Sequence, residues 1–158
     1  MEKIASFQVD HLRLLPGLYV SRKDKFGDTT ITTFDLRFKQ PNKEPVMDVP
    51  AIHTLEHLGA TFLRSHAKWS PRTVYFGPMG CRTGFYLILE GNYNSEEILP
   101  LIYELLDWIE KFEGEIPGAH PAECGNYSEQ NLGMAKWEAA RYAALLKKAA
   151  KENLNYPA

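Results

Sequence analysis

The sequence has few cysteines, no excess of basic residues and no long hydrophobic run. Two cysteines, Cys81 and Cys124, do not make a disulfide framework, and we expect both thiols to stay reduced. A net charge of −2 argues against nucleic-acid binding through a basic surface. No apolar run approaches the length of a membrane span, and residues 1–10 lack the apolar segment of a signal peptide. We therefore expect a cytoplasmic protein with neither a membrane nor a nucleic acid as partner.

The remaining composition is that of an ordinary globular protein. Hydrophobic residues make up 44% of the chain and charged residues 24%. A chain of 158 residues fits one domain, and no repeat or long linker divides it. We expect residues 1–158 to form a single compact domain.

Residues 31–38 show the clearest strand pattern in the sequence. Phe34, Leu36 and Phe38 fall on one face of this strand. Asp35 and Arg37 fall on the other face, where a polar side chain such as Arg37 is ordinarily solvated. The pattern therefore predicts a strand with one face in the core and one face in water.

The same periodicities predict the other elements. Shorter alternation predicts strands at residues 7–9, running towards His11, and at residues 73–76 and 83–89. Apolar residues at helical spacing predict helices that begin at Asp48, at Asn94 or Ser95, and at Ser128. The tail after Lys151 is expected to fray. Strands grouped around long helices indicate an α+β fold, with the helices packed on an antiparallel sheet.

The helix that follows Asp48 carries His53, Glu56 and His57. Residues three or four apart lie on one face of a helix, so both imidazoles can grip one metal ion beside Glu56. H-x-x-E-H is also the reversed form of the H-E-x-x-H metallopeptidase signature. A polar helix face with a Glu56–histidine pair is the simpler alternative. Two histidines at this spacing favour metal binding.

A cysteine can supply the third ligand. Cys124 lies in a Pro- and Gly-rich loop, residues 116–125, although a lone cysteine is more often a small buried residue. Two histidines and one thiolate leave a fourth position open, which is typical of catalytic sites. Cys81, at a glycine-rich bend, could supply the third ligand instead, and the spacing does not decide between them. Glu56 then either supports the metal site or acts as a general base.

Several longer motifs occur together over nearly the whole chain. They are Ser6-Phe7 with Asp10-His11, Phe34-Asp-Leu-Arg-Phe38 followed by Gln40-Pro-Asn42, His53-Thr-Leu-Glu-His57, Pro78-Met-Gly-Cys-Arg-Thr-Gly-Phe-Tyr86, and Glu123-Cys-Gly125. In this order, and in a chain of this length, they resemble the S-ribosylhomocysteine lyases, the bacterial autoinducer-2 synthesis enzymes. The H-x-x-E-H motif alone would not carry the resemblance.

The resemblance implies a metal-dependent cleavage of the thioether S-ribosylhomocysteine. The products would be homocysteine and 4,5-dihydroxy-2,3-pentanedione, the autoinducer-2 precursor, formed by carbonyl migration and β-elimination. His53, His57 and Cys124 would bind one divalent metal ion per subunit. That ion is usually ferrous iron in the family, and zinc or cobalt can occupy the same site. Glu56 and Cys81 would be the acid/base pair.

The resemblance also implies a homodimer with its active sites at the subunit interface. Ser6 and His11 would reach the partner's pocket, and Arg37 would bind polar groups of the substrate. One stretch departs from the pattern: some relatives carry an aspartate several residues before the motif cysteine, where this chain has Tyr75-Phe76-Gly77. The pocket wall near Cys81 is therefore left open.

Two functions of other classes remain compatible with these residues. One is a small inverted-zincin hydrolase in which Glu56 activates a metal-bound water, although such peptidases are far longer and generally use a carboxylate as third ligand. The other is a non-catalytic metal-binding module, in which both cysteines and both histidines close a four-ligand site. Two sulfur ligands on the metal would favour the module.

Overall fold

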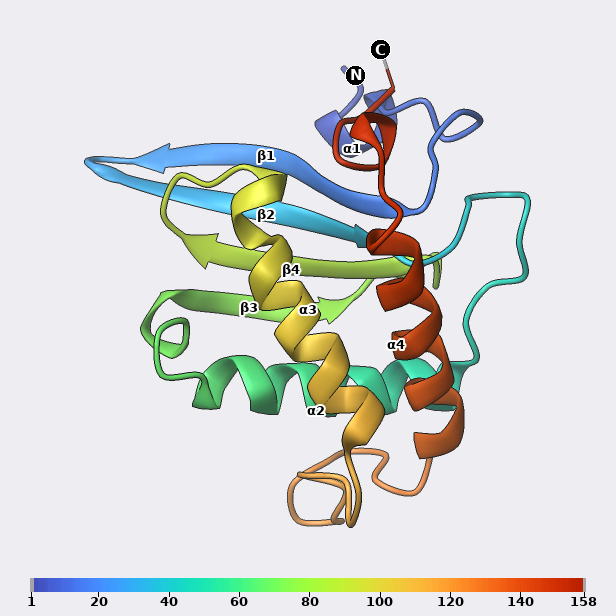
Figure 1. Ribbon diagram of the computed structural model, residues 1–158. Helices are drawn as coiled ribbons and strands as arrows, with labels where there is room; N and C mark the ends of the chain where they lie inside the picture. The colour runs from blue at the N-terminus through green and yellow to red at the C-terminus, as the bar shows by residue number, and fades with distance from the viewer. Residues whose placement is uncertain (1, 158) are drawn as a thin grey trace.

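The computed structural model describes residues 2–157 of the chain and forms a four-stranded sheet with three long helices on one face (Figure 1). The strands are β1 (Gly17–Phe26), β2 (Thr29–Arg37), β3 (Thr73–Pro78) and β4 (Gly84–Glu90). The helices are α1 (Ala5–Gln8), α2 (Val49–Ser65), α3 (Ser95–Lys111) and α4 (Leu132–Leu146), and short 3-10 turns lie at η1 (Ser70–Arg72) and η2 (Lys151–Asn153). The predicted α+β class is confirmed.

The sheet is antiparallel throughout, with the strand order β1-β2-β4-β3. The strands predicted at residues 31–38, 73–76 and 83–89 correspond to β2, β3 and β4. At the end of the central pair, Gly84 lies opposite Arg37, and a Cβ on Gly84 would lie 2.2 Å from the carbonyl oxygen of Leu36. This close approach places the glycine-rich bend before β4 next to Arg37.

Strand β1 was not anticipated from the sequence. Its second half is rich in charged residues and mostly exposed, so hydrophobic alternation is weak there. A signal for it exists in Gly27-Asp28, because Phe26 pairs with Thr29 across this dipeptide and Gly27 has a φ of 60°. Gly-Asp between two extended runs is a recognised hairpin signal. The β1–β2 hairpin could have been found from that turn.

The prediction of a strand at residues 7–9 is wrong, because residues 5–8 form helix α1. The Phe7 N–H donates to the carbonyl oxygen of Ile4 at 2.9 Å, which closes a helical turn. Alternation yields a stable strand only where another strand pairs with it. Within residues 2–157, the sheet contains only β1 to β4, and the Phe7 side chain stays 71% exposed.

Helix α4 begins at Leu132 and not at the predicted Ser128. The side chain of Asn131 caps it by accepting a hydrogen bond from the Met134 N–H at 3.0 Å. The Asn131 N–H in turn donates to Thr54 Oγ1 of α2 at 2.9 Å. Residues 128–131 therefore contact α2 before the helix starts.

The prediction of a frayed tail is also wrong, because side chains beyond Lys151 are docked. Asn153 Nδ2 donates to the carbonyl oxygen of Pro16 at 2.9 Å. The Tyr156 ring stacks on Tyr19 with ring centroids 4.8 Å apart. In Figure 1 the segment around α1 and the segment after α4 both lie above the sheet, and residues of both segments line one cavity.

The predicted start of helix α2 is confirmed. Asp48 Oδ2 accepts a hydrogen bond from the Ala51 N–H at 3.2 Å, and Pro50 lies in the first turn, where its missing N–H costs nothing. The apolar side of α2 enters the core, with Leu55 1% exposed. The opposite side stays partly exposed and carries the predicted metal ligands.

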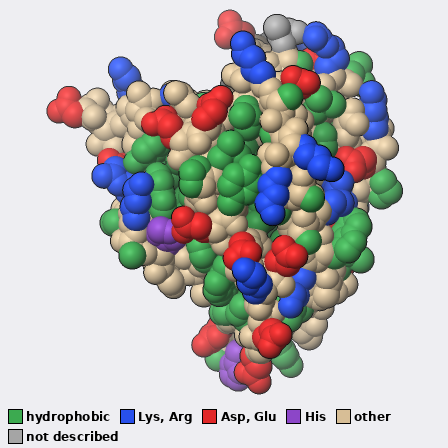
Figure 2. Space-filling model, in the orientation of Figure 1, with side chains coloured by type: hydrophobic (Ala, Val, Ile, Leu, Met, Phe, Trp, Pro, Cys, Tyr) green, Lys and Arg blue, Asp and Glu red, His purple; other side chains and the backbone are tan. Residues whose placement is uncertain are grey.

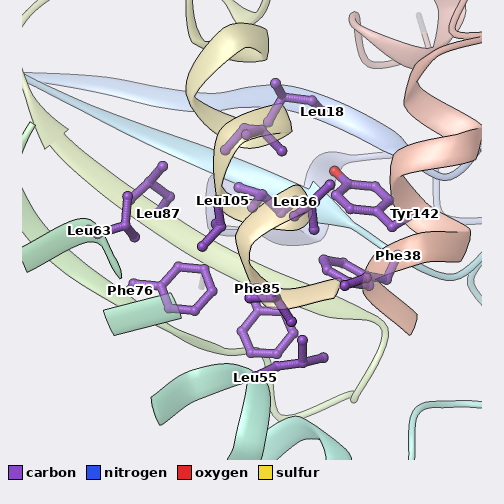
Figure 3. Packing of buried hydrophobic residues seen from close by; sticks show 14 of the residues in the cluster. Leu18, Leu36, Phe38, Leu55, Leu63, Phe76, Phe85, Leu87, Leu105 and Tyr142 are labelled. Atoms are coloured by element: carbon purple, nitrogen blue, oxygen red, sulfur yellow. The ribbon is translucent and has the colours of Figure 1, made fainter. Parts of the chain in front are cut away.

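The hydrophobic core lies between the sheet and the long helices (Figure 3). Phe76 of β3 and Phe85 of β4 stack at 5.1 Å with their rings 3° from parallel. Helix α2 comes close to this pair at Gly59, where a Cβ would lie 2.2 Å from Phe76 Cε1. The contact fixes the distance between α2 and the sheet.

The second face of the sheet is also partly covered, contrary to the prediction that its polar residues are solvated. Asp35 is fully buried and Arg37 is 4% exposed. The segment around α1 and the C-terminal Tyr156 lie over this face, because they line the same cavity as Arg37. The C-terminal tail and the N-terminal segment therefore cover polar side chains that were expected to contact water.

The molecular surface carries charges of both signs. On the face shown in Figure 2, Lys and Arg side chains are interspersed with Asp and Glu. Among residues 2–157, no helix combines the length and the apolar character needed to cross a membrane.

The Gly59–Phe76 contact predicts that Gly59→Ala lowers the free energy of unfolding by about 2–3 kcal/mol. The added methyl would overlap the Phe76 ring, and the stacking of this ring on Phe85 restricts its movement. Urea unfolding at one protein concentration and metal content measures the change. Gly133→Ala, whose Cβ would meet its nearest neighbour at 3.9 Å, is the matched control and should be neutral or stabilising. Equal stability of the two variants would contradict the tight contact.

Candidate active site and metal centre

His53, His57 and Cys124 meet at one point of the structure. The histidines lie one turn apart on α2, and Cys124 comes from the loop between α3 and α4. Their candidate ligand atoms all lie within 4.8 Å of one another. His57 Nε2 is 3.0 Å from His53 Nε2, and Cys124 Sγ is 3.4 Å from the same atom. Cys81 is not a member of this group, so the geometry favours Cys124 as third ligand.

Backbone carbonyls orient both imidazoles. His53 Nδ1 donates to the carbonyl oxygen of Glu129 at 2.9 Å, and His57 Nδ1 donates to that of Pro117 at 2.7 Å. Because a carbonyl oxygen only accepts, Nδ1 must carry the proton, and Nε2 of each neutral ring presents a lone pair. The sequence did not reveal these partners, which lie in irregular segments 76 and 60 residues further along the chain.

The donor set fits a divalent metal ion. Two Nε2 lone pairs that face each other at 3.0 Å repel, and a cysteine sulfur beside them adds to that repulsion. A cation between the three atoms turns the repulsion into attraction. Among residues 2–157 the group offers three ligands, which leaves a coordination position for water or substrate. Imidazole and a single thiolate suit iron, zinc and cobalt alike.

Glu56 lies on the same stripe of α2 as the two histidines and is partly exposed. Its carboxylate is not one of the three grouped ligands. A carboxylate in this position can accept and return a proton next to a metal site. The geometry thus agrees with a proton-transfer role as well as with support of the metal.

The other predicted site residues meet elsewhere, on the second face of the sheet. Ser6, His11, Arg37 and Cys81 line one cavity of about 360 Å³. Its remaining walls come from Phe7, Val9, Pro78, Met79, Gly80, Tyr86 and Tyr156. The residues of the metal group and Glu56 do not line this cavity. The predicted site is therefore divided into two separate clusters within one chain.

Arg37 is the best-held side chain of the cavity. Its Nε and Nη2 donate to the Asp35 carboxylate at 3.1 and 2.6 Å, and its Nη1 donates to Thr83 Oγ1 at 2.7 Å. Burial lowers the pKa of Arg37, but the charge and hydrogen bonds of Asp35, together with the charges of Cys81 and Tyr156, raise it above its usual value, so the guanidinium stays charged. Nη1 also lies 4.0 Å from Cys81 Sγ.

Cys81 is exposed at the bend between β3 and β4. Its sulfur lies 3.1 Å from Thr83 Oγ1, so both Arg37 and Cys81 contact the same hydroxyl. A permanent positive charge next to a cysteine sulfur suits a thiolate that acts as a base. The arrangement is compatible with the acid/base role expected for Cys81.

Two tyrosines of the cavity were not singled out from the sequence. Tyr86 lies directly opposite Asp35 in the sheet, and its pKa is raised, first by burial and then by the charge of Asp35. Tyr86 belongs to the glycine-rich bend motif that ends at this residue, and its period-2 relation to Gly84 could have placed it on this face. Tyr156 gave no signal, because a residue near the chain end was expected to be unordered.

An α+β domain with an open site of two histidines and one cysteine, and a separate thiol–arginine cavity, defines a candidate metalloenzyme. Comparison with known proteins narrows this class. The model of the family described as S-Ribosylhomocysteinase (LuxS) matches residues 4–153. The chain is 59% identical to the S-ribosylhomocysteine lyase of Clostridium acetobutylicum and 57% identical to that of Clostridium beijerinckii, over 99% of each chain. It is 55% identical to the S-ribosylhomocysteine lyase of Porphyromonas gingivalis, again over 99% of both chains. The chain belongs to the S-ribosylhomocysteinase (LuxS) family.

The three-ligand geometry predicts that Cys124→Ala loses its metal. Without the sulfur, two imidazoles retain less than about a tenth of the wild-type metal content. Elemental analysis of protein purified without oxygen measures the metal per subunit. Cys81→Ala is the matched control and should keep the wild-type content, because Cys81 lies outside the group. Loss of metal from the control would support the closed module with two sulfur ligands.

Proposed function

We propose that this protein is a carbon–sulfur lyase that cleaves S-ribosylhomocysteine to homocysteine and 4,5-dihydroxy-2,3-pentanedione. The observation that carries the proposal is the pairing of an open metal group with a separate thiol–arginine cavity, in a chain of the S-ribosylhomocysteinase family. The full-length relatives bear the name of this activity. We infer that the enzyme works in the cytoplasm, where its free cysteines stay reduced.

His53, His57 and Cys124 would hold one divalent ion per subunit. We expect ferrous iron in the native enzyme, with zinc or cobalt able to substitute, since these ligands bind all three. When bound, the ion supplies Lewis-acid polarisation of a substrate carbonyl, which acidifies the neighbouring C–H bond. The backbone carbonyls behind both histidines keep their Nε2 atoms directed at this position.

The substrate explains why an acid/base pair is needed. Its sulfur leaves only when a carbonyl stands next to the carbon that loses a proton, so the sugar carbonyl must first move from C1 to C3. Each move takes a proton from one carbon and returns a proton to the neighbouring carbon. The Cys81 thiolate and the Glu56 carboxylate are the groups of this chain that can carry those protons.

The last step breaks the carbon–sulfur bond. A base removes the proton at C4, and that electron pair forms a double bond between C4 and C5. The C5–S bond breaks with its electron pair on sulfur, and the sulfur takes up a proton to leave as homocysteine. The enol that remains gains a proton at C5 and loses the proton of its C4 hydroxyl, which gives 4,5-dihydroxy-2,3-pentanedione. We assign the proton transfers to Cys81 and Glu56 as a pair. Arg37, Ser6 and His11 would hold polar groups of the substrate in the cavity.

The separation of the two clusters supports a homodimer. Cys81 and Glu56 must reach one substrate, yet the cavity that holds Cys81 is not lined by Glu56 or the metal group. Large apolar side chains near the cavity are exposed, with Phe7 at 71% and Tyr75 at 47%. We therefore propose that a second copy covers this face and brings its own metal group, with Glu56, to the cavity.

The alternative functions have less support. An inverted-zincin hydrolase would generally use a carboxylate as third ligand, whereas the third grouped residue here is a loop cysteine. A closed metal module would need both sulfurs on the ion, and Cys81 lies outside the group. Neither alternative explains why a charged arginine is held beside Cys81.

Anaerobic incubation with S-ribosylhomocysteine tests the lyase directly. A thiol-reactive dye follows the release of homocysteine. Wild-type protein should release it only when metal is bound, and Glu56→Gln and Cys81→Ala should each lower kcat more than about a hundredfold while keeping the metal. Absence of release from the metal-loaded protein would reject the lyase. Full activity in either variant would reject the role assigned to that residue.

A mixed dimer tests whether each site is shared between subunits. Glu56→Gln and Cys81→Ala chains with different affinity tags are co-expressed, and the dimer that carries both tags is isolated. If each site takes Cys81 from one subunit and Glu56 from the other, one of the sites is intact and the mixed dimer has about half the wild-type activity. If each site belongs to one chain, the mixed dimer is as inactive as its parents. A monomeric wild-type protein in solution would equally contradict the shared site.

A further inference from the structure

The C-terminal tail reaches into the wall of the cavity that holds Arg37 and Cys81. Tyr156 lines this cavity together with both residues. Its hydroxyl donates to Asp35 Oδ2 at 2.7 Å. Its ring stacks on Tyr19, with the ring planes 17° apart. The tail is thus anchored at the carboxylate that also binds Arg37.

Asp35 connects the tail to the reactive end of the cavity. The carboxylate is fully buried, so water does not replace a lost donor. Its Oδ1 accepts from Arg37 Nε, and its Oδ2 accepts from both Arg37 Nη2 and the Tyr156 hydroxyl. Continuous hydrogen bonds therefore run from Tyr156 through Asp35 and Arg37 to Thr83, which contacts the sulfur of Cys81.

The protonation of these groups keeps Tyr156 a donor. Burial raises the pKa of Tyr156 far above its usual range, and the charge of Asp35 raises it further, so the hydroxyl stays neutral. Burial also raises the pKa of Asp35, while Arg37 and Tyr156 oppose this by donating to the ionised carboxylate. The loss of one donor would leave the buried oxygen dependent on Arg37 alone.

We propose that Tyr156 is a positioning residue for Arg37. By holding Oδ2 of Asp35, its hydroxyl fixes the plane of the guanidinium and keeps Nη1 directed at Thr83 and the sulfur of Cys81. The proposal rests on the proposed function for the roles of Arg37 and Cys81. It makes Tyr156 part of the machinery that positions the substrate-binding arginine.

A purely structural role for Tyr156 is the competing explanation. The stacking on Tyr19 and the hydrogen bond from Asn153 to Pro16 already anchor the tail. Tyr156→Phe separates the two roles, because it keeps the aromatic ring and removes the hydroxyl. The ring keeps the tail docked, so the variant should fold, and far-UV circular dichroism and thermal unfolding verify this.

The first readout is the chemistry of Cys81 towards two small reagents. Iodoacetate carries a carboxylate that the Arg37 guanidinium attracts, whereas iodoacetamide is neutral. The ratio of the two alkylation rates cancels the reactivity of the sulfur itself and reports the charge beside it. We expect Tyr156→Phe to lower this ratio about threefold. Peptide mass spectrometry of the metal-loaded protein assigns the alkylation to Cys81, and Arg37→Gln gives the ratio without the charge.

The second readout is the kinetics with S-ribosylhomocysteine. A displaced Arg37 weakens substrate binding, so Tyr156→Phe should raise KM about fivefold with kcat within about twofold of wild type. Tyr103→Phe is the matched control, because Tyr103 donates its hydroxyl to the carbonyl oxygen of Leu146 at 3.0 Å and does not line the cavity. It should leave both the alkylation ratio and KM unchanged.

The outcomes separate this proposal from the proposed function. A wild-type alkylation ratio and a wild-type KM in a folded Tyr156→Phe variant would overturn the positioning role. Equal changes in Tyr103→Phe would overturn it as well, since they would show a general effect of a lost hydroxyl. If wild-type protein releases no homocysteine, the proposed function fails, and the alkylation ratio alone then decides whether Tyr156 holds Arg37.

Discussion

The alternation of β2 is the constraint on which both clusters depend. Leu36 points into the core and its neighbours Asp35 and Arg37 point to the opposite face, where both are buried. The core face supports α2, which carries the metal group, and the opposite face supplies the floor of the thiol–arginine cavity. The metal group and the cavity of Cys81 therefore share no residue. A buried ion pair is tolerated on the second face because Nε, Nη1 and Nη2 of Arg37 each donate a hydrogen bond to Asp35 or Thr83.

The sequence was sufficient to predict those features that depend on residues only a few positions apart. Helical spacing placed His53, Glu56 and His57 on one stripe, and Asp48 with Pro50 marked the start of α2. Alternation located the three strands β2, β3 and β4. Choosing between Cys124 and Cys81 as third ligand required the path of the loop after α3, which no spacing rule contains. The resemblance to a known family supplied that choice before the structure did.

The errors concern contacts between segments that are distant in the sequence. Arg37 was expected in water because its pattern is that of an exposed strand face, and only the docking of both chain ends over that face buries it. Within residues 2–157, no strand pairs with residues 7–9, and despite their alternation this segment overlaps helix α1. Helix α4 begins later in the sequence than predicted, because the Asn131 N–H bonds to Thr54 before the helix starts. In each case the presence or absence of a tertiary contact, which a local pattern does not encode, decided the structure.

Tyr156 follows the core and the metal ligands along the sequence, which has a consequence for the order of synthesis. The residues of the metal group and most of the core leave the ribosome well before the tail does, and domains begin to fold as their segments emerge. The cavity around Arg37 obtains its last wall only when Tyr156 is free to dock. A chain that terminates a few residues early would thus keep its core and its metal ligands and yet lack a finished cavity. During synthesis the cavity is therefore finished after the core and the metal ligands.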